Sequence, residues 1–186
     1  MKLSVFTVCT PDLTPDALID AAKEAGLAGI EWRYAATPEA VRSEAPSFWR
    51  NNRCTLDPET VTDGELEALR EKVTVRGMKS VTLTPYLTCG DAAGTERAMR
   101  HAVRLGAGAI RVGVPRYDGS RPYPELFAEA IDYLTAVEEL SARYGVKGLV
   151  ETHHLTIAPS ASSVSIASLS MRGGRFRAVR GYHRSR

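Results

Sequence analysis

Residues 3–33 read LSVFTVCTPDLTPDALIDAAKEAGLAGIEWR and contain a short apolar strand, an amphipathic helix and a second strand. Thr14 is a suitable N-cap residue, and Pro15 follows it at the first helical position, where the missing N–H costs nothing. Gly26 stands where a helix end favours a residue with positive φ. The stretch therefore predicts a strand–helix–strand unit.

The same junction, a helix that ends at glycine followed by a short apolar strand, recurs three more times along the chain. The later glycines are Gly77, Gly106 and Gly145, and the strands expected after them are SVTLTPY (80–86), AIRVGV (109–114) and KGLVETHH (147–154). Helices are expected from about Asp63 with Leu66, Leu69 and Val73 inward, from about Thr95 with Ala98, Ala102 and Leu105 inward, and from about Pro124 with Phe127, Ile131, Leu134 and Val137 inward. Strict alternation of strand and helix implies parallel strands, either in a (β/α)₈ barrel or in a doubly wound sheet. No GxGxxG motif follows the first strand, which weakens the dinucleotide-binding form of the open sheet.

The stretch from Thr37 to Thr62 interrupts this rhythm with prolines and polar residues. It is interpreted as a long loop between a strand and the next helix. Loops of this kind build active sites in barrels, so it could cover a pocket. The alternative is a surface loop that the side chains of Phe48 and Trp49 hold in place.

Composition limits the class of protein. The chain has 186 residues, of which 44% are hydrophobic and 25% charged, and no apolar run is long enough to cross a bilayer. We expect a cytoplasmic protein without a signal peptide and with reduced cysteines. Residues 1–151 hold 18 basic and 22 acidic residues, whereas residues 152–186 hold six arginines and no acid. Because those arginines follow no helical or aromatic pattern, we do not expect nucleic acid binding, and the tail is interpreted as an irregular end.

Side chains alternate along each expected strand, which divides them into an apolar set for the helices and a polar set for the other face. Ile30 and Trp32 lie opposite Glu31 and Arg33. The same alternation places Val81 and Leu83 opposite Thr82, Thr84 and Tyr86, separates Ile110 and Val112 from Arg111, and separates Val146 and Val150 from Leu149, Glu151 and His153.

The polar side chains gather at the C-terminal ends of the strands, where barrel enzymes place their catalytic groups. The candidate site residues are Glu31, Arg33, Thr84, Arg111, Glu151 and His153. The alternative is a buried ion-pair network in which Glu31 is neutralised by Arg33 or Arg111. Glu151 and His153 together could present oxygen and nitrogen ligands to a divalent ion, although such a pair is a weak motif by itself. The planar guanidinium of Arg111 suits a carboxylate or phosphate group.

The chain resembles the xylose-isomerase-like (β/α)₈ superfamily of sugar-phosphate isomerases and epimerases. The similar segments are the opening stretch quoted above, TPYLTCGD, GAGAIRVGVPRYDG and GLVETHH, which together cover roughly residues 1–160. The resemblance implies that Glu151 is a ligand to a divalent metal (Mn, Mg, Co or Zn). In epimerase-like members it would also be one of two carboxylates that move a proton α to a carbonyl. His153 and Glu31 match positions that line the pocket for a small sugar-like substrate.

The C-terminal part departs from the family pattern. In place of a further helix and three strands, the chain runs SVSIASLSMRGGRFRAVRGYHRSR, without the Asp, His and Glu ligands that the family carries there. We therefore expect a partial TIM barrel of about five parallel strands over residues 1–160 and an irregular basic tail over 161–186, from a truncated or frameshifted product. Such a chain would lack most of the metal site and would be inactive. Whether it acts as an enzyme is left open.

Two alternatives to an isomerase or epimerase remain. One is a dehydratase-type member of the same superfamily. The other is a non-catalytic half-barrel that serves as a binding or assembly module, with self-association through its open sheet edges.

Overall fold

The computed structural model describes residues 1–163. Its strands are β1 (Ser4–Phe6), β2 (Gly29–Tyr34), β3 (Lys79–Pro85), β4 (Ala109–Val112) and β5 (Lys147–Val150). Its helices are α1 (Pro15–Glu24), α2 (Asp63–Val75), α3 (Ala92–Leu105) and α4 (Tyr123–Tyr144), with short 3₁₀ helices η1 (Thr7–Cys9) and η2 (Glu39–Val41). The five strands are parallel and form one sheet in the order β1-β2-β3-β4-β5. This arrangement confirms the predicted partial TIM barrel.

The chain divides into two compact units. One comprises residues 1–85 and 100–110, and the other comprises residues 86–99 and the described residues from 111 onward. The predicted boundary at residue 160 is not tested, because residues 164–186 of the expected tail lie outside the described part. None of the described helices is both long and apolar enough to cross a membrane.

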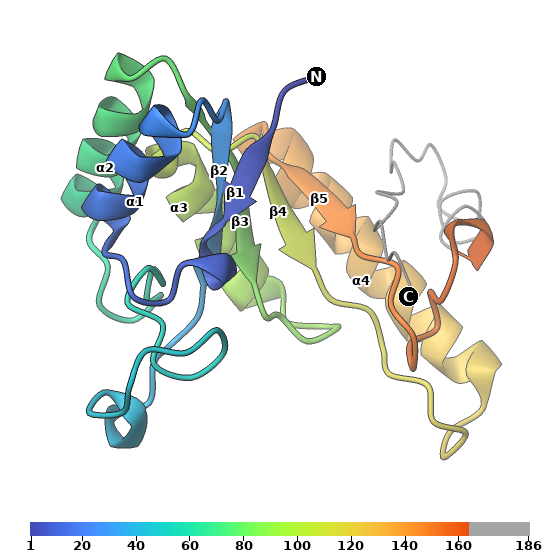
Figure 1. The fold of residues 1–186 in the computed structure, drawn as a ribbon. Helices are drawn as coiled ribbons and strands as arrows, with labels where there is room; N and C mark the ends of the chain where they lie inside the picture. The colour runs from blue at the N-terminus through green and yellow to red at the C-terminus, as the bar shows by residue number, and fades with distance from the viewer. Residues whose placement is uncertain (164–186) are drawn as a thin grey trace. The chain divides into compact units, whose positions relative to one another are not determined.

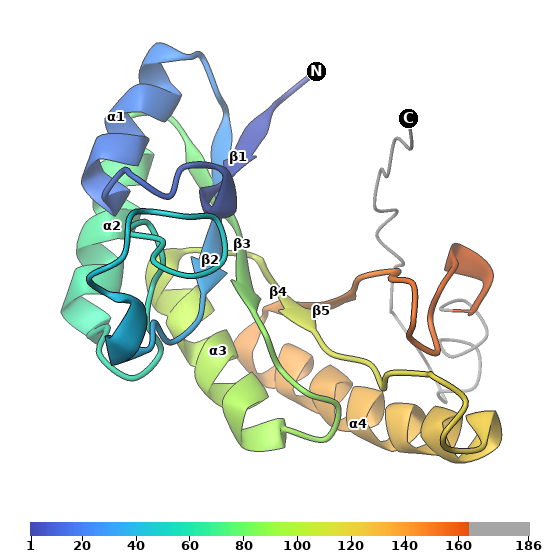
Figure 2. The ribbon, with the colours of Figure 1, turned by 60° about the horizontal axis from the view of Figure 1, so that its bottom comes forward.

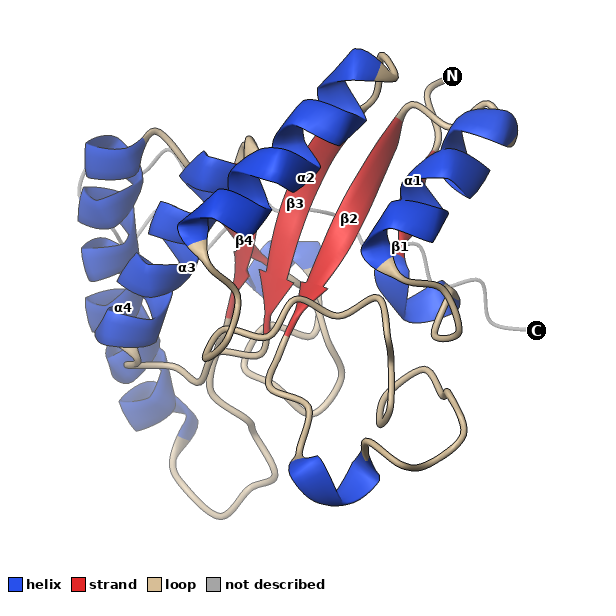
Figure 3. Cartoon of the chain, turned by 90° about the vertical axis from the view of Figure 1, so that its left-hand side faces the viewer, coloured by secondary structure: helices blue, strands red, loops and turns tan. Residues whose placement is uncertain are grey.

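In the first unit, α1 and α2 cover one face of β1, β2 and β3 (Figures 1 and 3). The side chain of Thr14 accepts a hydrogen bond from the Ala17 N–H, as an N-cap should. The predicted inward residues of α2, Leu66, Leu69 and Val73, are buried, and so are Leu18, Ile19 and Ala22 of α1. On β2, Ile30 and Trp32 are fully buried beneath the helices, and the indole N–H of Trp32 donates to the Ser80 hydroxyl at 3.0 Å. The face assignment for β2 is confirmed.

One predicted position on β3 is wrong. The register between β2 and β3 shifts, so that Ile30 lies opposite Ser80 but Glu31 lies opposite Thr82. Val81 is therefore an extra residue in the ladder, and it is 44% exposed instead of sharing the buried face with Leu83. The bulge moves the alternation by one residue.

Helix α3 begins three residues before the predicted Thr95, at Ala92. Asp91 explains the earlier start, since its carboxylate accepts a hydrogen bond from the Gly94 N–H at 2.8 Å and so caps the first turn. The predicted inward residues Ala98, Ala102 and Leu105 are buried.

In the second unit, α4 lies against β5 (Figure 2) and ends at Gly145, which adopts the left-handed conformation with φ of 68°. The buried stripe of α4 includes the predicted Leu134 and Val137, but in the first turns it passes through Leu126 and Ala130. The predicted Phe127 and Ile131 are only partly buried. Leu126 and Ala130 form a buried cluster with Ile157, which follows β5, and Phe127 packs against the edge of that cluster.

The predicted strand 147–154 is shorter in the structure and ends at Val150. After it the chain turns: the backbone N–H of His153 donates to the Ala158 carbonyl, and the Thr156 hydroxyl donates to the His153 carbonyl. Glu151 and His153 therefore follow the strand instead of lying within it.

Candidate functional site

Two of the predicted site residues, Glu31 and Thr84, contact each other on β2 and β3 of the first unit. The Thr84 hydroxyl donates to a carboxylate oxygen of Glu31 at 2.9 Å. Thr84 is buried and Glu31 is half-buried. Their side chains project from the face opposite the buried Trp32, so the polar face predicted for these strands is present.

Arg33 contacts the long loop between β2 and α2. It is 6% exposed, and its guanidinium donates to the Thr55 hydroxyl at 2.7 Å and to the Trp49 carbonyl at 3.0 Å. A buried guanidinium needs such partners, because an unpaired buried charge is costly. In this structure Arg33 fastens the loop at the end of β2.

The loop itself lies beyond the arrowhead end of β2 in Figure 3, and its anchoring residues are not marked by any motif in the sequence. Asn52 is 3% exposed, and its amide N–H groups lie 3.2 Å from the carbonyl oxygens of Thr7 and Phe48. Its own oxygen accepts from the Cys54 N–H at 2.9 Å. Phe48 and Trp49 are 56% and 61% exposed, so the interpretation that these aromatics fasten the loop is wrong.

Arg111 and Glu151 form an ion pair in the second unit, at the ends of the neighbouring strands β4 and β5. Nη1 of Arg111 donates to a carboxylate oxygen of Glu151 at 2.9 Å, and the two side chains are 25% and 48% exposed. The guanidinium also lies over the ring of Tyr86, 4.5 Å from the ring centroid. Within the second unit, Arg111 therefore has Glu151 as an ion-pair partner.

His153 lies on the exposed turn after β5. Its Nδ1 is 2.7 Å from the carbonyl oxygen of His154, to which it donates, and the two imidazole rings stack with centroids 4.2 Å apart. His153 is therefore close to Glu151 in the sequence, but its imidazole contacts His154.

Glu151 does not lie within a metal-binding cluster in the described part of the chain. Among residues 1–163, no group of three or more His, Cys, Asp or Glu side chains is arranged to hold a metal ion. One carboxylate oxygen of Glu151 is already engaged by Arg111. A single paired carboxylate does not fit a divalent ion, which in proteins takes four or more ligands.

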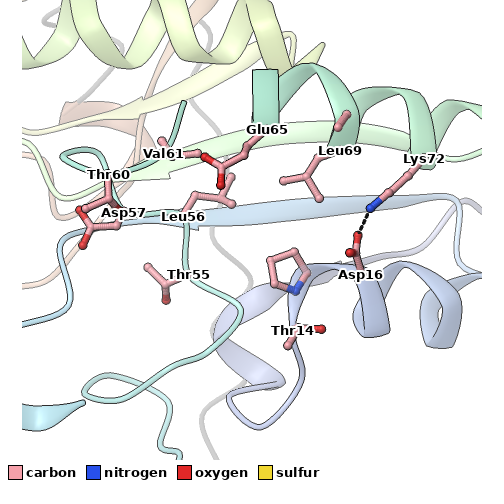
Figure 4. A pocket seen from close by; sticks show the side chains of 12 residues that line it. Thr14, Asp16, Thr55, Leu56, Asp57, Thr60, Val61, Glu65, Leu69 and Lys72 are labelled. Atoms are coloured by element: carbon pink, nitrogen blue, oxygen red, sulfur yellow. Dashed lines mark hydrogen bonds and ion pairs between the residues drawn. The ribbon is translucent and has the colours of Figure 1, made fainter. Parts of the chain in front are cut away.

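A pocket of about 450 Å³ lies elsewhere in the first unit, between the start of α1, residues 55–61 and α2 (Figure 4). None of the predicted site residues lines it. The ion pair between Lys72 and Asp16, with Nζ and Oδ1 2.7 Å apart, spans it from α2 to α1. Thr55, the hydroxyl acceptor for Arg33, belongs to its wall.

The alternation along the strand places Tyr86 on the polar face but does not by itself indicate a role for it. Its position directly after β3, in line with Thr84, is the signal that points to it. Asn52 has no such signal, because it lies in an irregular loop without periodicity.

The family model of the xylose isomerase-like TIM barrel matches residues 19–165 of this sequence. The chain belongs to this family, which confirms the resemblance identified from the sequence. No match to the chain is found among curated proteins.

Solved structures of this fold resemble the chain along nearly its whole length. The IolI protein with a bound zinc atom has a TM-score of 0.69 and 15% identity, over 96% of this chain and 62% of that one. The 3-keto-D-glucoside 4-epimerase YcjR from E. coli has a TM-score of 0.70 and 13% identity, over 96% and 67%. The probable 3-DHS dehydratase AsbF from Bacillus anthracis has a TM-score of 0.65 and 16% identity, over 96% and 62%. At these identities the likeness shows the fold alone.

The first structures that the chain matches are longer than it is. The chain spans 59%, 62% and 57% of their lengths. It therefore corresponds to part of the barrel that they form.

Proposed function

We propose that this chain is part of a metal-dependent isomerase or epimerase that acts on a small sugar or a sugar-derived acid. The observation that carries the proposal is the Arg111–Glu151 pair, because a carboxylate and a guanidinium stand at the ends of adjacent parallel strands, where barrel enzymes bind substrate. Membership of the xylose isomerase-like family supports it. An epimerase and a dehydratase among the similar structures show which reactions this fold carries in other proteins.

We assign Glu151 the role of acid/base carboxylate. A carboxylate that removes the proton α to a carbonyl leaves an enediolate. Protonation of the same carbon from the other face, by a second acid that the whole protein would have to supply, gives an epimer. Return of the proton from Glu151 to the neighbouring carbon of the enediolate gives an isomer. Arg111 binds an anionic or hydroxyl group of the substrate, and His153 offers a further hydrogen bond. Glu31 and Thr84, in the first unit, stay predicted substrate-binding residues. Arg33 acts on the same process indirectly, through the loop that it anchors.

A metal ion, where the whole protein has one, would polarise the substrate carbonyl. Glu151 is the residue of this chain that we propose as a ligand, but the described residues offer it no companions. We therefore expect the chain by itself to bind divalent ions weakly and to turn over no measurable substrate. A dehydratase reaction is the second candidate, since it begins with the same proton abstraction and then expels a hydroxyl group from the next carbon.

Two measurements test this proposal. Isothermal titration with Mn²⁺ or Zn²⁺ should give weak, non-saturating heats for the chain. Its Glu151→Gln variant and the control Glu139→Gln, which changes an exposed carboxylate on α4, should behave alike. Tight binding of one ion per chain that is lost only in Glu151→Gln would overturn the expectation of an incomplete site.

The second measurement is incubation with D-fructose in D₂O, followed by NMR of the sugar. Deuterium should not enter the sugar above the rate of a protein-free control. Incorporation that depends on Glu151 would refute inactivity while supporting the assigned proton transfer. Incorporation that Glu151→Gln leaves unchanged would refute the role given to that carboxylate.

A further inference from the structure

Tyr86 is the first residue after β3, and its ring supports the guanidinium of Arg111. The guanidinium carbon lies 4.5 Å from the ring centroid, within the range in which a cation is attracted to the face of an aromatic ring. Tyr86 is 46% exposed and the Arg111 side chain is 25% exposed. The pair therefore stands at the surface, open to a ligand from solvent.

The backbone holds Tyr86 in this place. Gly113 follows β4 closely, and a Cβ atom built on it would lie 2.2 Å from the Leu87 carbonyl oxygen. The two chain segments that follow β3 and β4 thus approach each other as closely as glycine permits. Tyr86 and Arg111 stand beside this contact, so the ring is brought to the guanidinium by the fold as well as by attraction.

We propose that Tyr86 is a positioning residue that holds Arg111 to receive an oxyanion group of the substrate, a carboxylate or a phosphate. This inference deepens the proposed function and rests on it for the identity of the substrate as a sugar derivative. A guanidinium presents its N–H groups in its own plane. The ring of Tyr86 covers one face of the Arg111 guanidinium and leaves the edge, where the N–H groups point, for an oxyanion.

Glu151 already shows such an approach. Its carboxylate accepts from Nη1 of Arg111 at 2.9 Å and so occupies the position that an external carboxylate would take. The Glu151 side chain is 48% exposed, and ion pairs with this much exposure contribute little. An anion from solvent can therefore replace Glu151 at the guanidinium while the ring of Tyr86 keeps Arg111 in place.

The experiment follows the Nε–H signal of Arg111 by NMR in the ¹⁵N-labelled full chain without added metal. The signal is assigned with the Arg111→Lys variant. This readout separates Arg111 from the other arginines. The probes are D-glucuronate for a carboxylate, inorganic phosphate for a phosphate, and D-glucose as the neutral control. D-glucuronate, phosphate or both should shift the signal in a saturable manner, and D-glucose should not.

Variants separate positioning from a general structural effect. Tyr86→Leu should weaken anion binding about two- to fivefold, the factor that corresponds to an exposed cation–π contact. Tyr86→Phe, which keeps the ring, should restore wild-type affinity. Tyr117→Leu changes a tyrosine of similar exposure, 40%, elsewhere in the unit and should have no effect. Glu151→Gln should strengthen anion binding, because the internal competitor loses its charge.

Several results would overturn the inference. One is the absence of any saturable shift with either anion. Another is equal affinity in Tyr86→Leu and the wild type. A third is a loss in Tyr86→Phe as large as in Tyr86→Leu, which would assign the effect to the hydroxyl group. This measurement uses neither a metal nor turnover. Its outcome can therefore be interpreted even if the proposed catalysis fails, and a negative outcome here does not decide the tests of the proposed catalysis.

Discussion

The buried amide of Asn52 is one of the anchors of the loop between β2 and α2, and Asn52→Ala removes it. The Asn52 side chain bridges the end of β1 to the loop, through the carbonyl oxygens of Thr7 and Phe48 and the backbone N–H of Cys54. Thr7 and Cys54 are both 0% exposed. Water therefore has no ready access to the groups that the substitution leaves behind.

The magnitude follows from those groups. A buried N–H or carbonyl left without its partner costs about 1–3 kcal/mol. Asn52→Ala leaves the Cys54 N–H without its acceptor and removes one of the donors to the Thr7 carbonyl oxygen. We expect a loss of about 3 kcal/mol in the free energy of unfolding, which for a chain of this size lowers the melting temperature by about 6–12 °C.

The assay is equilibrium unfolding in urea, followed by the fluorescence of Trp32 and Trp49. Ser43→Ala, an exposed substitution in the same loop, serves as the matched control and should change stability by less than about 0.5 kcal/mol. If Asn52→Ala unfolds at the same urea concentration as Ser43→Ala, the side chain does not anchor the loop and the reasoning fails.

The remaining predictions concern a helix cap and the cysteines. Thr62→Ala should destabilise the chain by about 1 kcal/mol in thermal unfolding, because it removes the N-cap that accepts from the Glu65 N–H. The backbone N–H and the hydroxyl of Thr62 donate to the Glu65 carboxylate and lower the pKa of Glu65. The stabilisation that ionised Glu65 gives is therefore fully present above the pKa that Glu65 has in the unfolded chain. This stabilisation should be lost as the pH falls through the lowered pKa of Glu65 in the folded chain. A Glu65→Gln variant whose stability depends on pH as the wild type's does would contradict this. Burial raises the pKa of Cys54 to about 12 and that of Cys89 to about 11, so iodoacetamide at pH 8 should label the exposed Cys9 first, as mass spectrometry can check. Rapid labelling of native Cys54 would show that the loop opens.

The order and direction of the elements follow from the sequence because the signals that set them are local. The Thr14 cap, the glycine that ends each helix and the alternation along β2 each act within a few residues. The pairing between strands, in contrast, is set by residues that are far apart in the sequence. The extra residue at Val81 depends on how β3 meets β2, and alternation along a single strand cannot reveal it.

The partners of polar residues also escape the sequence pattern. Alternation places Arg33 on the polar face, which suggested a pocket residue. In the structure its guanidinium is buried because the loop returns over it and supplies a hydroxyl and a carbonyl as acceptors. Asn52 satisfies buried backbone groups in a segment with no periodicity, so nothing in its spacing marks it.

The two interpretations that the sequence left open, an ion-pair network and a polar pocket, need not exclude each other. Arg111 and Glu151 make an ion pair, yet both remain partly exposed at the ends of their strands. An exposed pair is weak enough to be exchanged, whereas an isolated carboxylate or guanidinium has no internal partner to give up. If Arg111 binds an anion as we propose, Glu151 would orient the guanidinium in the absence of a ligand and would be replaced when a stronger anion binds. Under the proposed function, the ion pair is the unliganded state of the proposed anion site, and its modest strength would make Arg111 available for binding.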